Sequence, residues 1–366
     1  MTLPEISTLR IQNQQIEGPV FQSAKDLIAW MGALQAQDYA MAKWAIGQRV
    51  PGTTNQSVEE AYNAGEIIRT HMMRPTWHFV SADDIYWMLE LTAPRVKQVL
   101  KSRDRQLELT ETIFSKSRDM LERMLSNCLS MTREELTQEY ANIHVATDEN
   151  RLSHLIMRAE LDGIVCSGPM RKKKLTYSLL EDRVPAKTIL SRDEAVATLA
   201  GRYFRSHGPA TLRDFVWWSG LSVTDAREGL EMIRPAFLRE TIATETYWFA
   251  DSLRSLPAPA PSVHLLPAYD EFLIAYTDRA AALATVHTRK AISTNGIFQP
   301  IIVVNGQVEG LWRRTTVKDL VKIELNPFHL HNPRTTQAIE TEAARYGAFL
   351  DKRILLSTRQ LPETSL

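Results

Sequence analysis

The sequence of 366 residues has little cysteine, no excess of either charge and no long apolar run. Cys128 and Cys166 are too few for a disulfide framework in a chain of this length, which favours free thiols in a reducing compartment. Lys and Arg total 43 and Asp and Glu total 43, so the formal net charge is zero; this excludes a uniformly basic nucleic-acid binder but not one with a basic face. No apolar stretch approaches the roughly 18 residues that span a bilayer, and the N-terminus lacks signal-peptide order. We therefore expect a cytoplasmic protein with no membrane partner.

The common catalytic motifs are also missing. There is no HExxH and no CxxC, and the nine His residues lack paired metal-ligand spacing, so we expect no metal. The absence of GxxxxGK[ST], GxGxxG and GxSxG argues against NTPase, dinucleotide and serine hydrolase chemistry. We expect no cofactor.

Internal repetition is the first positive signal. A Ser or Thr followed three residues later by Asp or Glu indicates a helix start. Such pairs open amphipathic stretches at Ser23/Asp26, Ser57/Glu60, Thr132/Glu135, Ser191/Glu194, Thr211/Asp214 and Ser222/Asp225. Strand pairs follow at 67–71 with 76–80, 164–168 with 175–180, and 238–243 with 246–250. Helix, helix, hairpin is the order of a winged helix.

These signals predict an α+β protein with three tandem winged-helix units and a C-terminal module. We expect winged helix 1 at 1–82, linking helices at 83–130, winged helix 2 at 131–190 and winged helix 3 at 191–255. The stretch LPAPAPS, from residue 256, is typical of a linker. Asn305-Gly306 between two apolar runs then predicts a type I′ hairpin. Residues 256–366 are expected to form a β-barrel-like module with a terminal helix from about Thr335 to Lys352.

The second predicted hairpin carries a basic tip. A winged helix places a helix in a DNA groove and its wing on the backbone, where cations neutralise phosphates. The candidate DNA-binding cations here are Arg171, Lys172, Lys173 and Lys174. A solvated hairpin tip is the alternative interpretation.

Gln35-Ala36-Gln37 follows the first amphipathic stretch, and two exposed glutamines would be its plain interpretation. Residues i and i+2 of an α-helix face away from each other. Gln35 and Gln37 therefore serve one site only where the backbone leaves helical geometry for strand-like alternation. Asp38 is a rival base, for which a helix-end or surface position is favoured.

Four elements give the chain a resemblance to the winged-helix DNA glycosylases of the AlkZ and YcaQ type. They are Gln35/Gln37, RPTWHFV from Arg74, LRDFVWWSGLS from Leu212 and LLPAYDEFLIAY from Leu265. The motif of this chain, with glutamine at both positions, resembles that of the AlkZ-like branch, because YcaQ-like members have an acidic residue at the second position. The resemblance implies a bacterial DNA repair enzyme that hydrolyses the N-glycosidic bond of alkylated purines in double-stranded DNA, crosslinked ones included. It also implies a C-shaped clamp of three winged helices and a β-barrel. We expect a monomer.

The resemblance places catalysis at Gln35 and Gln37. A neutral amide is no strong general base, but an N7- or N3-alkylated purine is already cationic and leaves without protonation. The amides would position water beneath C1′, with Gln37 the more important. Further DNA-binding candidates are Arg74 and His78, and pocket candidates are Asp38, Thr76, Trp77 and Asp270.

Two alternatives remain open. In the alternative interpretation of the RPTWHFV element, Trp77 and Phe79 pack inward while Arg74 and His78 are solvated. Trp217 and Trp218 are expected in the core rather than stacked on bases. The rival function is a non-catalytic winged-helix regulator, for which the two glutamines would be superfluous.

Overall fold

The computed structural model describes residues 1–251 and 261–359, and within them one topology occurs three times. A short strand or bridge precedes two helices and a hairpin, and the last strand of the hairpin pairs back with the first segment. The first copy consists of β1 (Leu34–Gln35), α3 (Tyr39–Arg49), α4 (Asn55–Ala64), β2 (Ile67–Met72) and β3 (Arg74–Ser81). The second consists of β4 (Met131–Thr132), α7 (Arg133–Asn142), α8 (Arg151–Leu161), β5 (Val165–Arg171) and β6 (Lys174–Leu179). The third has the Ala210–Trp248 bridge, α11 (Leu212–Ser219), α12 (Val223–Ile233), β7 (Leu238–Ile242) and β8 (Glu245–Phe249).

Side-chain caps define most of the predicted helix starts. Thr132, Ser191 and Thr211 each form both halves of a capping box, which satisfies backbone N–H groups that have no partner within the helix. The prediction at Ser57 was three residues late. Thr54 is the N-cap of α4, and Ser57 takes the position of the acidic partner in its capping box.

The first helix pair was predicted incorrectly. Helix α2 (Ala24–Met31), which opens at the predicted Ser23 cap, ends at Gly32, whose φ of +80° breaks the helix, so Leu34 already lies on β1. The helix that pairs with α4 in this copy is therefore α3, which the sequence did not reveal. Nine of its 11 residues are buried, and a helix buried on almost all sides lacks the polar stripe that marks amphipathic periodicity.

Two long helices lie between the first and second copies. They are α5 (Ile85–Gln106) and α6 (Glu111–Leu125). Helix α10 (Arg192–Ser206) precedes the third copy, and α1 (Leu3–Asn13), which was not predicted, opens the chain. No described helix is both long and apolar enough to cross a membrane.

The C-terminal module is an open sheet and not a barrel. Its order is β13-β12-β11-β10-β9, and among the described residues the edge strands β9 (Val263–Leu266) and β13 (Arg353–Thr358) do not pair with each other. The inner strands are β10 (Ile301–Val304), β11 (Gln307–Val317) and β12 (Leu320–Pro327). The Asn305-Gly306 hairpin is confirmed, with both residues at positive φ. Residues 256–260 of the predicted linker lie outside the described residues.

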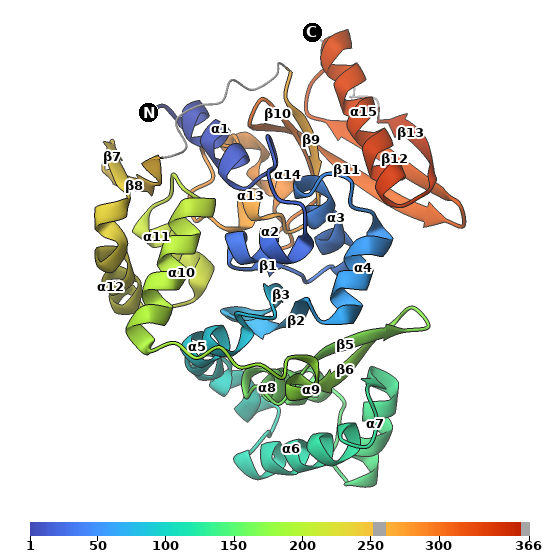
Figure 1. The fold of residues 1–366 in the computed structure, drawn as a ribbon. Helices are drawn as coiled ribbons and strands as arrows, with labels where there is room; N and C mark the ends of the chain where they lie inside the picture. Colours follow the sequence, from blue (N-terminus) through green and yellow to red (C-terminus); the bar gives the residue numbers. More distant parts are fainter. Residues whose placement is uncertain (252–260, 360–366) are drawn as a thin grey trace.

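The first copy lies in the middle of the molecule, between the other two copies and the C-terminal sheet (Figure 1). It shares a hydrophobic core with that sheet and with α15 (Pro333–Phe349), the predicted terminal helix. The ring of Trp44 on α3 lies 4.9 Å from Tyr346 and 5.1 Å from Phe349 between centroids. Its indole N–H also donates to the Leu265 carbonyl at 2.8 Å. The Gln35–Gln37 segment is therefore anchored beside the C-terminal module.

Candidate active site

The Gln35–Gln37 segment is extended. Strand β1 pairs antiparallel with β3, with Gln35 opposite His78, and the Ala36 N–H donates to the Trp77 carbonyl at 2.7 Å. Helix α3 begins only after Asp38. This meets the condition under which the two glutamines serve one site.

The two glutamine side chains have different surroundings. Gln35 is 5% exposed, and its Oε1 accepts the Gln37 N–H at 3.0 Å. Gln37 is exposed. Because an amide oxygen has two lone pairs, Gln35 retains acceptor capacity while it shapes the turn that presents Gln37.

Buried polar atoms without partners gather around this segment. Thr70 and Gln35 both pair with His78 in the sheet, so the three residues lie on one face. Within the described part of the chain, Thr70 Oγ1, Thr76 Oγ1 and His78 Nε2 are buried without a hydrogen-bond partner, as are Nε and Nη2 of Arg74. A group left unpaired in this way costs about 1–3 kcal/mol, so a cluster of them marks a place where water or a ligand completes the bonding.

His78 does not have the surface position expected of a DNA contact. It is 0% exposed, and its Nδ1 lies 3.0 Å from the Thr76 carbonyl. Burial, reinforced by the charge of Arg74, holds the pKa of His78 well below its ordinary value, so the imidazole is neutral. His78 therefore belongs to the wall of the site, and the alternative of a solvated His78 is wrong too.

Arg74, Trp77 and the tandem tryptophans surround this wall. Arg74 is half-buried, with its guanidinium 5.5 Å from the Trp217 ring centroid. Trp77 is half-buried against His71, with ring centroids 4.2 Å apart. The expectation of core packing is confirmed for Trp218, which is 0% exposed. It is wrong for Trp217, which is 42% exposed because it lies at the edge, where its indole N–H donates to the Ile274 carbonyl.

A buried carboxylate contacts β1 of the candidate active site. Glu271, the first residue of α13 (Glu271–Ile274), is 1% exposed. Its Oε1 accepts the Gln35 N–H at 2.8 Å and its Oε2 accepts the Trp218 indole N–H at 3.0 Å. Burial opposes ionisation, but the imidazole of His207, the Gln35 N–H and the charge of Arg74 outweigh it and hold the pKa of Glu271 below its ordinary value. The site therefore contains a fixed negative charge.

Asp270 has a structural position and not the pocket position expected of it. It is 4% exposed and receives two hydrogen bonds from Arg49 of α3, at 2.9 and 2.7 Å. Sequence reasoning missed Glu271, the next residue, although the LLPAYDEF element that contains both was itself a signal. Asp38 is the N-cap of α3, accepting the Met41 N–H at 3.1 Å, which is the helix-end position favoured for it.

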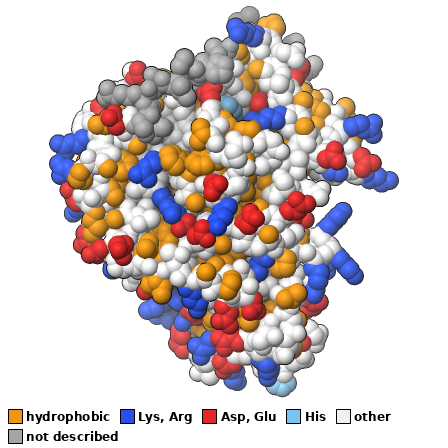
Figure 2. Space-filling view, viewed as in Figure 1, with side chains coloured by type: hydrophobic (Ala, Val, Ile, Leu, Met, Phe, Trp, Pro, Cys, Tyr) orange, Lys and Arg blue, Asp and Glu red, His pale blue; other side chains and the backbone are white. Residues whose placement is uncertain are grey.

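The basic tip of the β5–β6 hairpin is partly neutralised. Arg171 pairs with Glu135, and Lys174 lies 3.5 Å from Glu134. Lys172 and Lys173 are exposed and make no ion pair with any described residue. Figure 2 shows cationic side chains projecting from this tip. Two of the four predicted cations thus remain without a neutralising partner at the tip.

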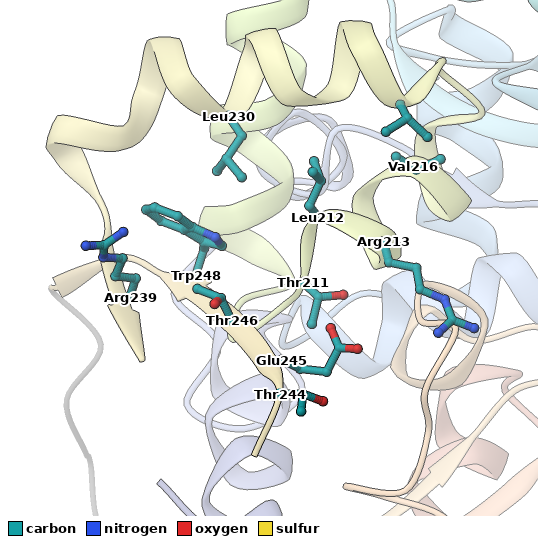
Figure 3. Close-up of a pocket in the computed structure, with 11 residues that line it drawn as sticks. Thr211, Leu212, Arg213, Val216, Leu230, Arg239, Thr244, Glu245, Thr246 and Trp248 are labelled. Carbon is teal, nitrogen blue, oxygen red and sulfur yellow. The ribbon is translucent and has the colours of Figure 1, made fainter. Parts of the chain in front are cut away.

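A surface pocket of about 520 Å³ lies away from these residues, on the third copy (Figure 3). It is bounded by α11, α12 and the β7–β8 hairpin, and its charged lining residues are Arg213, Arg239 and Glu245. It contains one carboxylate and neither catalytic glutamine candidate. We therefore place the candidate active site at β1 and β3.

Comparison with known proteins establishes the family. The family described as DNA glycosylase AlkZ-like matches residues 28–349. The chain belongs to this family. It is a DNA glycosylase, and DNA is its substrate, so the rival function of a non-catalytic regulator is set aside.

Two relatives from Streptomyces sahachiroi extend the match. This chain is 25% identical over 360 residues to a protein described as an interstrand DNA cross-link repair glycosylase. The match covers 93% of this chain and 94% of that protein. The solved structure of the DNA glycosylase AlkZ matches with a TM-score of 0.80 and 20% identity, over 98% of this chain and 100% of that chain. This structural likeness shows the shared mixed α+β fold.

Proposed function

We propose that the glycosylase excises purines carrying a positive charge from N7 or N3 alkylation, with Gln35 and Gln37 holding the attacking water. The observation that carries this proposal is the exposed Gln37 on an extended segment whose turn is fixed by the Gln35 amide at 3.0 Å. Gln37 is the member of the pair that DNA reaches directly. Asp38, the rival base, is engaged as a helix cap.

The chemistry needs no strong base. A cationic purine departs with its bonding electrons and becomes neutral, which leaves positive charge on the sugar. Amide oxygens accept hydrogen bonds from the water and face the developing charge. When the water oxygen bonds to C1′ of the cationic sugar, the resulting protonated hydroxyl releases its proton to solvent. Fixed negative groups in a water-poor site stabilise such charge more than they would in bulk water. Glu271, bonded to the Gln35 N–H, supplies one.

We further propose that the three repeats are winged helices that clamp double-stranded DNA as a monomer. The units would be 1–82, 131–190 and 191–255, joined by the linking helices of 83–130 and followed by the C-terminal module of 256–366. The repeated topology supports this, since a hairpin follows each helix pair. The uncompensated Lys172 and Lys173 at one hairpin tip supply a backbone contact.

Crosslinked purines are a second substrate class. The Streptomyces relative is named for cross-link repair. A crosslinked base is too bulky to enter a closed pocket, so its enzyme must present the catalytic group at an open surface. The exposure of Gln37 fits that requirement.

The test is a panel of duplexes, each with one N7-methylguanine, N3-methyladenine, uracil or interstrand crosslink, scored for strand breaks after alkali. We expect excision of both methylated purines and unhooking of the crosslink, with uracil untouched. Uracil excision at a similar rate would show that the enzyme protonates or otherwise activates a neutral leaving group, contrary to the proposal. Tight binding of all four duplexes with no product would contradict the assigned substrates.

A further inference from the structure

Three metal-ligating side chains converge on the C-terminal module, away from the active site. Glu309 projects from β11, and His329 and His331 follow the end of β12. Glu309 Oε2 lies 3.1 Å from His329 Nε2 and 3.3 Å from His331 Nδ1, and the three ligand atoms all lie within 4.8 Å of one another. From the sequence we expected no metal and overlooked the His329-x-His331 spacing, whose third candidate ligand comes from another strand.

The two separations between Glu309 and the imidazoles match those of a metal site. A tetrahedral ion with bonds of about 2.0–2.1 Å to nitrogen and oxygen holds its ligands about 3.3 Å apart. Two histidines and one glutamate make up a known zinc donor set, with the fourth position left to water. The backbone holds the two segments in register, because the Phe328 N–H donates to the Glu309 carbonyl at 2.8 Å.

The charges also favour a cation. Among the described residues the ion-pair partners of Glu309 are the two imidazoles, with no Lys or Arg. The side chain of His331 is 7% exposed, and its Nδ1 faces Glu309 at 3.3 Å. The carboxylate therefore faces the two imidazoles and no cationic side chain of a described residue.

We propose that Glu309, His329 and His331 bind zinc or a similar divalent transition-metal ion that ties β11 to the segment between β12 and α15. His329, more than half exposed at 55%, gives the ion its route from solvent. The site shares no residue with the Gln35–Gln37 segment, so the ion stabilises the module and takes no part in excision.

The test uses the full chain, stripped with EDTA and titrated with Zn²⁺ by calorimetry and with Co²⁺ by visible absorption. We expect one ion per chain, a d–d spectrum typical of four-coordinate cobalt, and a higher midpoint of thermal unfolding with Zn²⁺. His329→Gln and Glu309→Gln each remove a ligand, and each should weaken binding by more than the roughly 10–100-fold effect of removing an outer-shell partner. Excision should be unchanged by EDTA.

The matched control is His144→Asn, which removes an exposed histidine while keeping a residue that tolerates the positive φ of 55°. This variant should bind Zn²⁺ like the wild type. The proposal is overturned if the wild type binds no Zn²⁺, or if its affinity and cobalt spectrum match those of His329→Gln. Because His329 is exposed, that variant folds whether or not the ion binds.

Discussion

Glu271 and Asp270 are adjacent in the chain, and they bind two different parts of the first copy. Glu271 accepts the Gln35 N–H at 2.8 Å, on the strand that enters the segment. Asp270 pairs with Arg49, near the end of the helix that leaves it. Glu271 therefore ties the Gln35–Gln37 segment to the C-terminal module, and Asp270 ties the end of α3 to the same module.

Replacing Glu271 by Gln tests this role. The glutamine side chain has one acceptor oxygen where the carboxylate has two. Its NH2 group would therefore face the N–H of either Gln35 or Trp218, and two donors form no hydrogen bond with each other. We expect a loss of about 1–3 kcal/mol in the free energy of unfolding, and a lower single-turnover excision rate with unchanged DNA affinity. Urea unfolding, filter binding and rapid-quench assays measure the three quantities.

Glu340→Gln on α15 is the matched control, since Glu340 is exposed. It should leave stability and excision unaltered. Equal excision by the wild type and Glu271→Gln would show that the carboxylate does not position the catalytic strand.

At the scale of elements, the β5–β6 hairpin combines strain with charge. Lys172 and Lys173 have φ of 50° and 65°, a left-handed backbone conformation that disfavours residues other than Gly and Asn. A left-handed conformation costs an L-residue about 1–2 kcal/mol, and Asn-Gly is the usual sequence for such a turn. Retaining two lysines at this position fits a tip that contacts phosphates.

Lys172→Asn with Lys173→Gly separates the two effects. We expect the protein to gain about 1 kcal/mol or more in stability as the strain is relieved. DNA binding should weaken, with the slope of log affinity against log salt reduced by about 0.9 for each phosphate that is no longer neutralised. Lys172→Arg with Lys173→Arg keeps the charge and should keep the affinity. Unchanged binding by the Asn-Gly variant would remove the hairpin from the DNA interface.

Sequence patterns predicted elements that local chemistry determines and missed those that tertiary packing determines. The caps at Thr132 and Thr211 and the Asn305-Gly306 turn depend on neighbouring residues and were confirmed. Helix α3 is covered by the C-terminal module, so its sequence shows no polar face. The geometry of the candidate site also depends on tertiary packing and was missed for the same reason. The extended backbone of Gln35 is set by β3, and Glu271 comes from a distant segment.

At the scale of the whole molecule, the zero net charge leads to a prediction about its distribution. On the face shown in Figure 2, acidic and basic side chains are interspersed. DNA binding requires a face where phosphates meet cations, and we propose that Lys172 and Lys173 belong to it. That the inner surface of the proposed clamp is basic stays a prediction.

Buried neutral histidines make the stability of the whole molecule depend on pH. Burial, with Arg345 and Arg49 nearby, lowers the pKa of His264 from 6.5 to about 4. Between these values the unfolded chain binds a proton that the folded chain does not, so stability is complete above pH 6.5 and falls as the pH drops toward 4. The loss from this residue is about 3 kcal/mol, at roughly 1.4 kcal/mol per pKa unit. His78 and His207 act in the same direction, since burial lowers their pKa values too.

Urea unfolding at pH 7.5, 6 and 5 measures this dependence. His264→Gln removes one titrating group, so its stability should fall less steeply over this range than that of the wild type. Parallel curves for the two proteins would mean that the pKa of His264 is the same in the folded and the unfolded chain.

The central claim is that Gln37, oriented by Gln35, holds the water that attacks the sugar. The most direct test is single-turnover excision of N7-methylguanine by Gln37→Ala and by the Gln35→Ala/Gln37→Ala double variant, with duplex affinity measured in parallel. The account predicts that Gln37→Ala slows excision by about 100-fold or more, that the double variant shows no excision, and that both bind DNA like the wild type. Undiminished excision by the double variant would contradict it.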